Sequence, residues 1–175
     1  MPVHGQIGWA ALAVVALCLE SNAHAEEEAS EASSSAVHFE QGRPVIGATF
    51  GVGFGSGRTA LAAGLSVGVP PISGVLPGIR GLLIAEDGVG GELALTLALA
   101  PPFSASILPF AIGEVGRRFV EDSADAWLFG AGGGLLIGEP SSALNFQLGW
   151  MFRRLDFPSG SLDASGPIFG VSARL

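Results

Sequence analysis

The sequence contains no lysine, no tyrosine and a single cysteine, Cys18, among its 175 residues. Cys18 lies in an apolar N-terminal segment, so a chain cleaved behind that segment would carry no disulfide, no thiol nucleophile and no thiolate metal site. The 8 basic residues are all arginines and form no basic stretch, whereas 16 residues are acidic. An acidic chain without a basic patch is a poor candidate for binding nucleic acid.

Long apolar runs are also missing. The composition is 49% hydrophobic, yet it includes 27 glycines and 11 prolines spread along the chain. After residue 25 no apolar run reaches the roughly 18 residues that a membrane-spanning helix needs. A β-strand presents only every second side chain to lipid, so a barrel can sit in a membrane without any helix-like window.

The N-terminus has the pattern of a secretory signal peptide. An apolar core over Ile7–Leu19 is followed by Ala23 and Ala25, the small residues of an A-x-A cleavage site, and Glu26 follows the cut. The residues before the core include no lysine or arginine, which is atypical. An uncleaved helical anchor and lipidation at Cys18 are the alternatives.

Three regions follow from these patterns: a signal peptide over 1–25, an acidic leader over 26–44 and a strand-rich domain over 45–175. The leader has few large apolar side chains to bury, so we expect it to be disordered. Cleavage after residue 25 would leave 15 acidic and 8 basic residues, a net charge of −7.

From residue 45 onward apolar residues alternate with small or polar ones, as in strands whose two faces differ. The pattern predicts eight strands, separated by Gly- and Pro-rich breaks. The phase of the third and the fifth is ambiguous, and Pro109 suggests a bulge or a late start in the fifth. The predicted strands are Ile46–Phe54, Leu61–Val69, Gly78–Glu86, Leu93–Leu99, Ser106–Arg117, Trp127–Ile137, Leu144–Phe152 and Ile168–Leu175.

The bulky faces of these strands carry Leu, Phe, Trp and Val, and the opposite faces carry mainly Gly, Ala, Ser and Thr. An exterior of Gly and Ala would suit a soluble barrel poorly, whereas a bulky exterior suits lipid. Five aromatic residues fall at or near the outer ends of their predicted strands, where they would form an interfacial girdle: Phe54, Trp127, Trp150, Phe152 and Phe169. We therefore predict an all-β fold, an eight-stranded antiparallel up-and-down transmembrane barrel after a cleaved signal peptide.

The last segment, Phe169 to Leu175, ends the chain with apolar residues at every second position. It resembles the C-terminal strand of bacterial outer-membrane β-barrel proteins, although Leu175 stands where that family commonly has Phe. The whole chain resembles the small eight-stranded members. The resemblance implies an outer-membrane location, contact with outer-membrane lipid and recognition of the last strand by the barrel-insertion machinery.

The chain offers little catalytic chemistry. Some small barrels of this family are lipid A deacylases or acyltransferases, which resemble hydrolases that need His and Ser. After cleavage the single histidine is His38, in the leader and apart from any strand serine, so we expect no enzyme activity. The acidic loop of Glu121, Asp122 and Asp125 lacks the spacing of a Ca²⁺ site, and so do Asp156 and Asp163. We expect no metal and no cofactor.

Charged residues on the predicted non-lipid faces are the most informative site candidates. Inside a narrow barrel they would pair across the lumen, because an unpaired buried charge is costly. Such a network is either a structural plug or the gate of a pore. The candidates are Arg80, Glu92, Glu114, Arg153 and Arg174.

These observations favour a non-enzymatic outer-membrane barrel with an envelope structural or surface-interaction role, whose exposed loops lie near 55–60, 85–91, 117–126 and 154–165. The alternatives are a narrow pore for small solutes, a lipid-modifying enzyme and a soluble barrel, periplasmic or secreted, with a ligand cavity.

Overall fold

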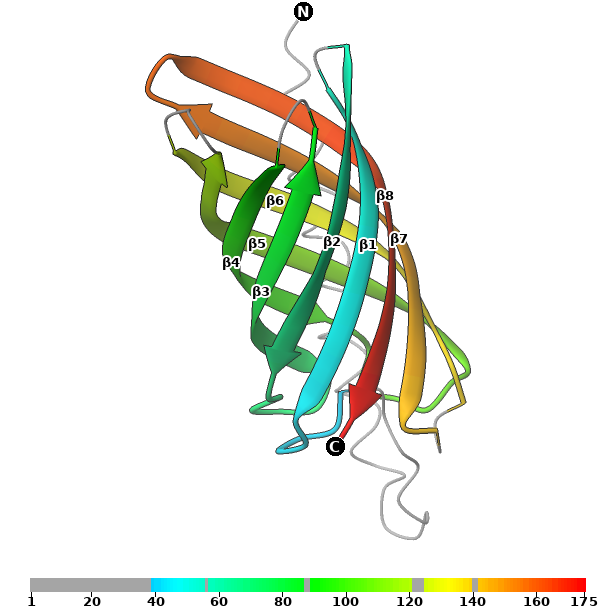
Figure 1. Ribbon diagram of the computed structural model, residues 1–175. Coiled ribbons are helices and arrows are strands. Elements are labelled where there is room, and N and C mark those ends of the chain that lie inside the picture. The colour runs from blue at the N-terminus through cyan, green and yellow to red at the C-terminus, as the bar shows by residue number, and fades with distance from the viewer. Residues whose placement is uncertain (1–38, 56, 87–88, 121–124, 140–141) are drawn as a thin grey trace, which may run out of the picture.

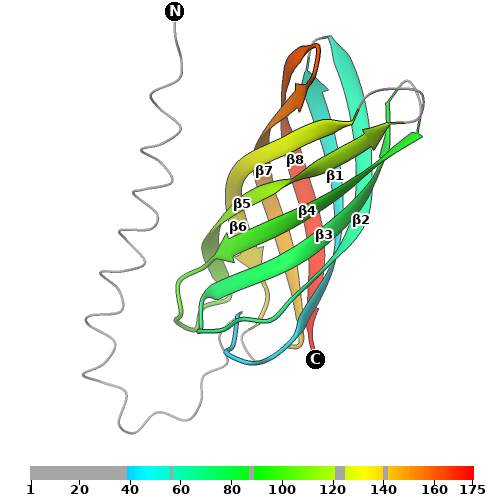
Figure 2. The same cartoon turned by 90° about the vertical axis from the view of Figure 1, so that its left-hand side faces the viewer.

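The computed structural model describes residues 39–55, 57–86, 89–120, 125–139 and 142–175, and it is a closed β-barrel (Figures 1 and 2). Each strand pairs antiparallel with its neighbours in sequence, and the last pairs with the first. The predicted eight-stranded, all-β, up-and-down barrel is confirmed, while the predicted signal peptide lies outside the described residues. The strands are β1 (Val45–Gly55), β2 (Arg58–Gly68), β3 (Val75–Ala85), β4 (Val89–Leu99), β5 (Ile107–Val120), β6 (Ala126–Ile137), β7 (Leu144–Phe157) and β8 (Gly160–Arg174).

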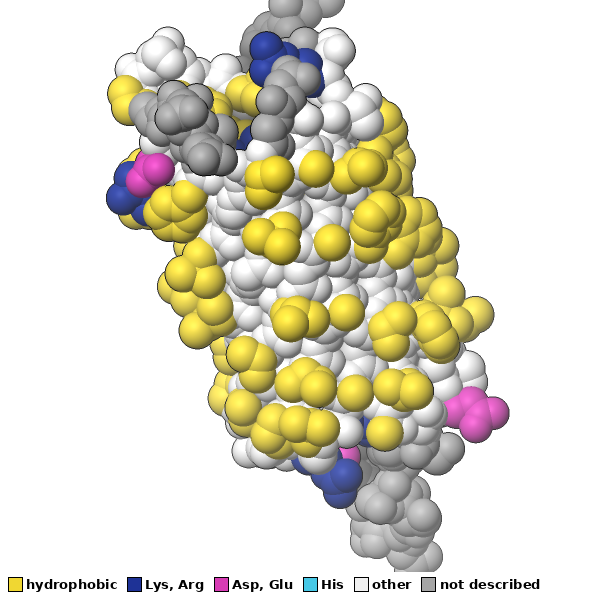
Figure 3. All heavy atoms as spheres, viewed as in Figure 1, with side chains coloured by type: hydrophobic (Ala, Val, Ile, Leu, Met, Phe, Trp, Pro, Cys, Tyr) yellow, Lys and Arg dark blue, Asp and Glu magenta, His cyan; other side chains and the backbone are white. Residues whose placement is uncertain are grey.

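The bulky apolar residues point away from the barrel axis, as the alternation predicts. Leu65 of β2 and Leu83 of β3 are each 70% exposed on the outer surface. Hydrophobic side chains cover the middle of the face shown in Figure 3, and charged side chains gather towards its two ends. None of the described residues forms a helix long and apolar enough to cross a membrane.

The structure also resolves the two ambiguous strands. In β3 the side chains of Arg80 and Leu82 are buried while Leu83 is exposed, and in β5 Leu108 and Glu114 are buried. The even-numbered residues of both strands therefore face the lumen.

The proline inside β5 lies where that strand pairs with only one of its two neighbours. Pro109 pairs with Leu135 of β6, but the pairing of β5 with β4 begins only at Ala111. At that position proline removes no hydrogen bond to β4, because that neighbour is absent. The expectation of a bulge or a late start at Pro109 is therefore wrong: β5 begins at Ile107 and continues through the proline.

We call the end where β1 begins and β8 ends the inner end, and the opposite one the outer end. The connections at the inner end are 69–74, 100–106 and 138–143, and those at the outer end are 56–57, 86–88, 121–125 and 158–159. The outer connections are the shorter set. Much of the predicted loop 154–165 belongs to β7 and β8.

The leader over 26–44 was predicted to be disordered, but its last six residues are ordered. Residues 39–44 lie against the inner end, where the amide of Gly42 donates to the carbonyl of Pro70 at 2.8 Å. The Phe39 side chain is 3% exposed. The expectation of disorder is wrong for this stretch because Phe39 finds an apolar site in the barrel, and residues 26–38 lie outside the described part.

The lumen is filled in three layers. An apolar cluster that includes Leu108, Phe110 and Leu136 occupies the inner part. A second apolar cluster includes Leu128 and Leu155. Ionised side chains from four strands form the third layer. Eight strands enclose a space that side chains can just fill, and this barrel is filled in that way.

Candidate functional site

The charged layer of the lumen is the candidate site. Strand alternation turns Arg80 of β3, Glu92 of β4 and Glu114 of β5 inward, and each is at most 7% exposed. Four residues after Glu114, and so on the same face of β5, Arg118 is also buried. Arg153 of β7 and Glu86, directly after β3, complete the set. We call these six residues the charge cluster.

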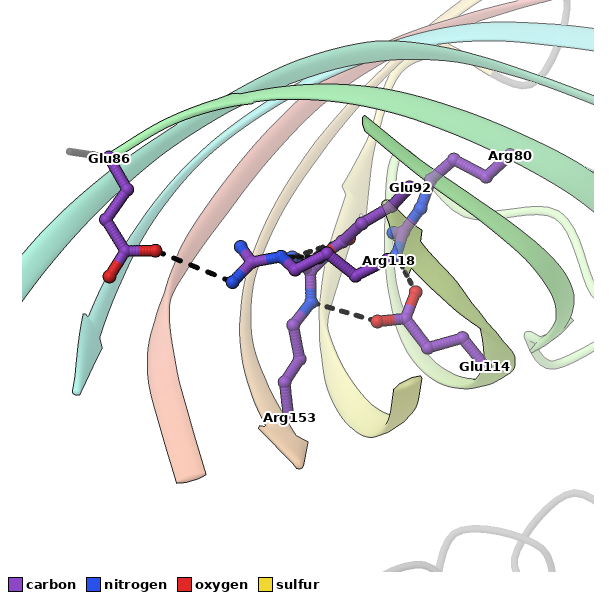
Figure 4. A network of polar contacts seen from close by, with 6 residues as sticks. All are labelled: Arg80, Glu86, Glu92, Glu114, Arg118 and Arg153. Carbon is purple, nitrogen blue, oxygen red and sulfur yellow. Dashed lines mark hydrogen bonds and ion pairs between the residues drawn. The ribbon is translucent and has the colours of Figure 1, made fainter. Parts of the chain in front are cut away.

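The charge cluster is a continuous chain of ion pairs (Figure 4). Glu114 contacts Arg80, and its other carboxylate oxygen lies 2.9 Å from Nε of Arg153. Arg153 reaches Glu92 through Nη1, with a separation of 3.5 Å from Oε2. Two acidic and two basic side chains from four different strands are joined in this way.

The series of ion pairs continues through Arg118 and Glu86. Nε of Arg118 donates to Oε1 of Glu92 at 3.0 Å. Nη1 of Arg118 lies 3.5 Å from Oε2 of Glu86. Figure 4 shows the guanidinium of Arg118 between the two carboxylates.

The charge cluster is electrically balanced, because three arginines face three glutamates. Desolvating an ion is costly unless oppositely charged partners and hydrogen bonds compensate it. Glu114 and Glu92 each meet two guanidinium groups. Removing Glu114 or Glu92 would leave buried guanidinium groups without a carboxylate partner, so the arrangement ties β3, β4, β5 and β7 together across the lumen.

Four of the five predicted lumen charges belong to this cluster, and the fifth does not. Arg174 lies at the inner end, where Nη2 donates to the carbonyl of Ser142 at 2.6 Å and Nη1 lies 3.7 Å from Oε2 of Glu40. Sequence reasoning missed Arg118 and Glu86. Arg118 was detectable, because it follows the candidate Glu114 by an even number of residues.

Two cavities adjoin the charge cluster. The outer cavity is lined by Glu86, Glu92, Arg118 and Arg153, and the inner cavity by Arg80 and a set of uncharged polar residues. The polar residues of the inner cavity are Thr49, Ser66, Thr96, Gln147 and Ser172.

The predicted aromatic girdle is only partly where the sequence suggested. Its five members all face outward with 45–52% of their surface exposed, and Phe54 and Trp127 lie next to the outer ends of β1 and β6. Placing Trp150, Phe152 and Phe169 at outer ends is wrong. Strand β7 continues to Phe157 and β8 begins at Gly160, so these three lie within their strands.

Arginines engage the described acidic residues near the outer end. Asp125 lies 3.6 Å from Arg117, whose guanidinium stands 5.2 Å from the ring centre of Trp127. Asp156 accepts from Arg154 at 2.9 Å. Within the described ranges no group of three or more His, Cys, Asp or Glu residues could hold a metal ion. The candidates Glu121 and Asp122 lie outside those ranges, as does His38.

Comparison with known proteins shows the fold. No sequence-family model and no curated protein sequence matches the chain. The N-terminal β-barrel domain of Pseudomonas aeruginosa OprF is similar with a TM-score of 0.55 and 15% identity, over 77% of this chain and 98% of that one. Neisserial surface protein A (NspA) is similar with a TM-score of 0.60 and 8% identity, over 76% and 96%. The chain therefore has the fold of small eight-stranded outer-membrane barrels.

Proposed function

We propose that the protein is a non-enzymatic integral barrel of a bacterial outer membrane, with an envelope structural or surface-interaction role. The observation that carries the proposal is the inverted cross-section: apolar residues cover the outside, and the charge cluster is inside. In water an apolar patch of more than several hundred Å² is unusual for a monomer. In a bilayer the same surface would contact lipid hydrocarbon, and the closed barrel leaves no unpaired strand edge.

The filled lumen supports a structural role over transport. Apolar side chains and the charge cluster occupy the interior, and the cavities on either side of the cluster are small. The outer connections are at most five residues long. Any surface interaction would therefore use the ends of the strands and their turns rather than long loops.

A narrow pore is the second candidate, favoured by the presence of cavities on both sides of the charge cluster. Conduction would require side chains in the lumen to move, because both cavities are small. Planar-bilayer recording separates the two candidates. We expect no steady conductance from the wild-type barrel, and well-defined channels would move the assignment to a pore.

Assembly through the last strand is part of the proposal. The outward side chains of Phe169 and Val171 are 45% and 41% exposed, and Leu175 is 68% exposed. An apolar row of this kind is the feature through which we infer that the insertion machinery recognises the chain. Outer-membrane lipid is the other expected partner.

The test of location is an SDS gel of outer-membrane fractions, loaded with and without boiling. We expect a mobility shift on heating in that fraction, because a closed barrel in lipid resists SDS until it is heated. Recovery of the protein from the soluble periplasmic or culture fraction, without a shift, would refute the membrane assignment and favour a secreted ligand-binding barrel. Altered lipid A in an overexpressing strain would instead support the lipid-modifying enzyme.

A further inference from the structure

The inner mouth of the barrel is covered by the chain that precedes β1. Gly74, in the connection between β2 and β3, donates its amide to the carbonyl of Phe39 at 3.0 Å. The amide of Gly42 bonds the carbonyl of Pro70 in the same connection at 2.8 Å. Leu175 donates to the carbonyl of Pro44 at 3.0 Å. Residues 39–44 are thus held at both the β2–β3 connection and the end of β8.

The Phe39 side chain enters an apolar socket. It is 3% exposed and belongs to the inner cluster, whose buried members come from strands on several sides of the lumen. These members are Ala98, Ala100, Leu108, Phe110, Leu136, Met151 and Ile168. Phe39 is the member that comes from outside the strands and their connections, so its position is not imposed by the hydrogen-bonded ladder.

Phe39 also borders the polar inner cavity. It lines this cavity together with Arg80 of the charge cluster and with the hydroxyl and amide side chains of Ser66, Thr96 and Gln147. Polar groups in a cavity of this kind gain from contact with water. An aromatic ring between such groups and the inner mouth therefore separates them from the solvent at that end.

We propose that residues 39–44 form a plug that closes the inner mouth reversibly, with Phe39 as the side chain that seals it. The attachment is local: one side chain in a socket, a few backbone hydrogen bonds and two ion pairs of the partly exposed Glu40 side chain. The ion pairs join Oε2 of Glu40 to Arg43 at 3.2 Å and to Arg174 at 3.7 Å. Such a segment can open while the strand ladder stays intact, as terminal segments with few contacts commonly do.

Behind the Phe39 plug, Arg80 of the charge cluster lines the inner cavity. Opening the plug connects the inner cavity with the solvent at the inner end. The outer cavity is lined by other members of the charge cluster, and the two cavities share only Thr49 and Ile168 as lining residues. The proposal therefore concerns access to the inner cavity and holds whether or not the barrel conducts.

The test uses cysteine accessibility in the full barrel, with Cys18→Ser as the background. Ser172→Cys places a thiol in the inner cavity, where the wild-type serine is 3% exposed. Ala164→Cys places a comparison thiol in the outer cavity, on the lumen-facing phase of β8 opposite Arg153. A small water-soluble methanethiosulfonate reagent reports the rate of modification of each thiol, with Phe39 intact or replaced by Ala.

We expect Phe39→Ala to raise the modification rate of the thiol at position 172 by about tenfold or more, since burying a Phe side chain shifts an equilibrium by at least that factor. The rate at position 164 should change much less, and Phe39→Leu, which still fills the socket, should keep the thiol at position 172 slow to react. Equal rates at position 172 with and without Phe39 would overturn the plug.

A heat-dependent gel shift verifies that each variant is a folded barrel. If Phe39→Ala fails to fold, Glu40→Gln loosens the plug without changing the socket. We then expect the modification rate at position 172 to increase by about twofold to fivefold, as for the loss of partly exposed ion pairs. No increase in this variant would count against the proposal.

Discussion

Gly130 of β6 makes room for the carboxylate of Glu114. A Cβ atom at Gly130 would lie 2.6 Å from both Cγ and Oε1 of Glu114, closer than such atoms approach in real structures. Glu114 cannot easily retreat, because Arg80 and Arg153 both contact its carboxylate. The glycine opposite Glu114 is therefore a requirement of the charge cluster rather than a consequence of sequence composition.

The first prediction concerns this glycine. Gly130→Ala should lower the free energy of unfolding by about 1–3 kcal/mol, the usual cost of forcing an extra carbon into a packed interior. Urea titration of the barrel in phospholipid vesicles measures it. Gly113→Ala is the matched control: its Cβ meets no atom within 4 Å, so we expect no loss of stability there. Equal losses in the two variants would contradict the argument.

The second prediction compares two glutamates of the charge cluster. Glu114→Gln leaves Arg80 and Arg153 without their shared carboxylate, and breaking a buried pair of this kind costs about 3–5 kcal/mol. Glu86 has a side chain that is 23% exposed, and its Oε2 lies 3.5 Å from Nη1 of Arg118. For Glu86→Gln we expect a loss below about 1 kcal/mol. Unfolding free energies of both variants in the same vesicles decide this, and a reversed order would show that Glu114 does not link the cluster.

Alternation in the sequence was sufficient to predict the number of strands, and the face that each residue occupies except in the third and fifth strands, whose phase was ambiguous. It failed at the outer ends of β7 and β8. There Arg154, Asp156 and Asp163 interrupt the apolar row, while the hydrogen-bonded ladder continues past them. Pairing does not depend on apolar side chains, so a strand that extends beyond the apolar band loses its sequence signature but not its structure.

The candidate site could also be predicted only in part. Glu92 and Arg153 follow from the phase of their strands, whereas Arg80 and Glu114 were candidates in strands of ambiguous phase. Arg118 was missed because the predicted fifth strand ended one residue too early. Arg174 shares the phase of a lumen residue, yet it lies at the inner end of β8 beyond the reach of the charge cluster. The position of Phe39 depends on a socket built by residues far away in sequence, so no local pattern could reveal it.

The third prediction concerns assembly. Leu175→Ser removes an exposed apolar side chain at the end of β8 but leaves the backbone bond to Pro44 possible. We expect the heat-shifting, assembled fraction in cells to fall severalfold if, as proposed, the insertion machinery recognises the apolar row of which Leu175 is part. Purified protein refolded in detergent should keep its unfolding free energy. If stability falls as much as assembly, the side chain acts in the fold and the recognition argument fails.

The fourth prediction tests what surrounds the barrel. Leu95 lies in the middle of β4 and is 62% exposed on the outer surface. Leu95→Arg should cost about 2–4 kcal/mol of unfolding free energy in phospholipid vesicles, because the guanidinium is placed against hydrocarbon. If water covered this face, the same change would fall within about 0.5 kcal/mol of zero, as exposed substitutions usually do.

The matched control for this charge is Ser159→Arg, in the exposed turn between β7 and β8. It adds the same side chain beyond the apolar band, so we expect no measurable loss of stability in vesicles. A large cost at residue 95 together with none at residue 159 requires a hydrocarbon layer around the middle of the barrel. Two equally small effects would require water there instead, and the inverted cross-section would then need a different explanation.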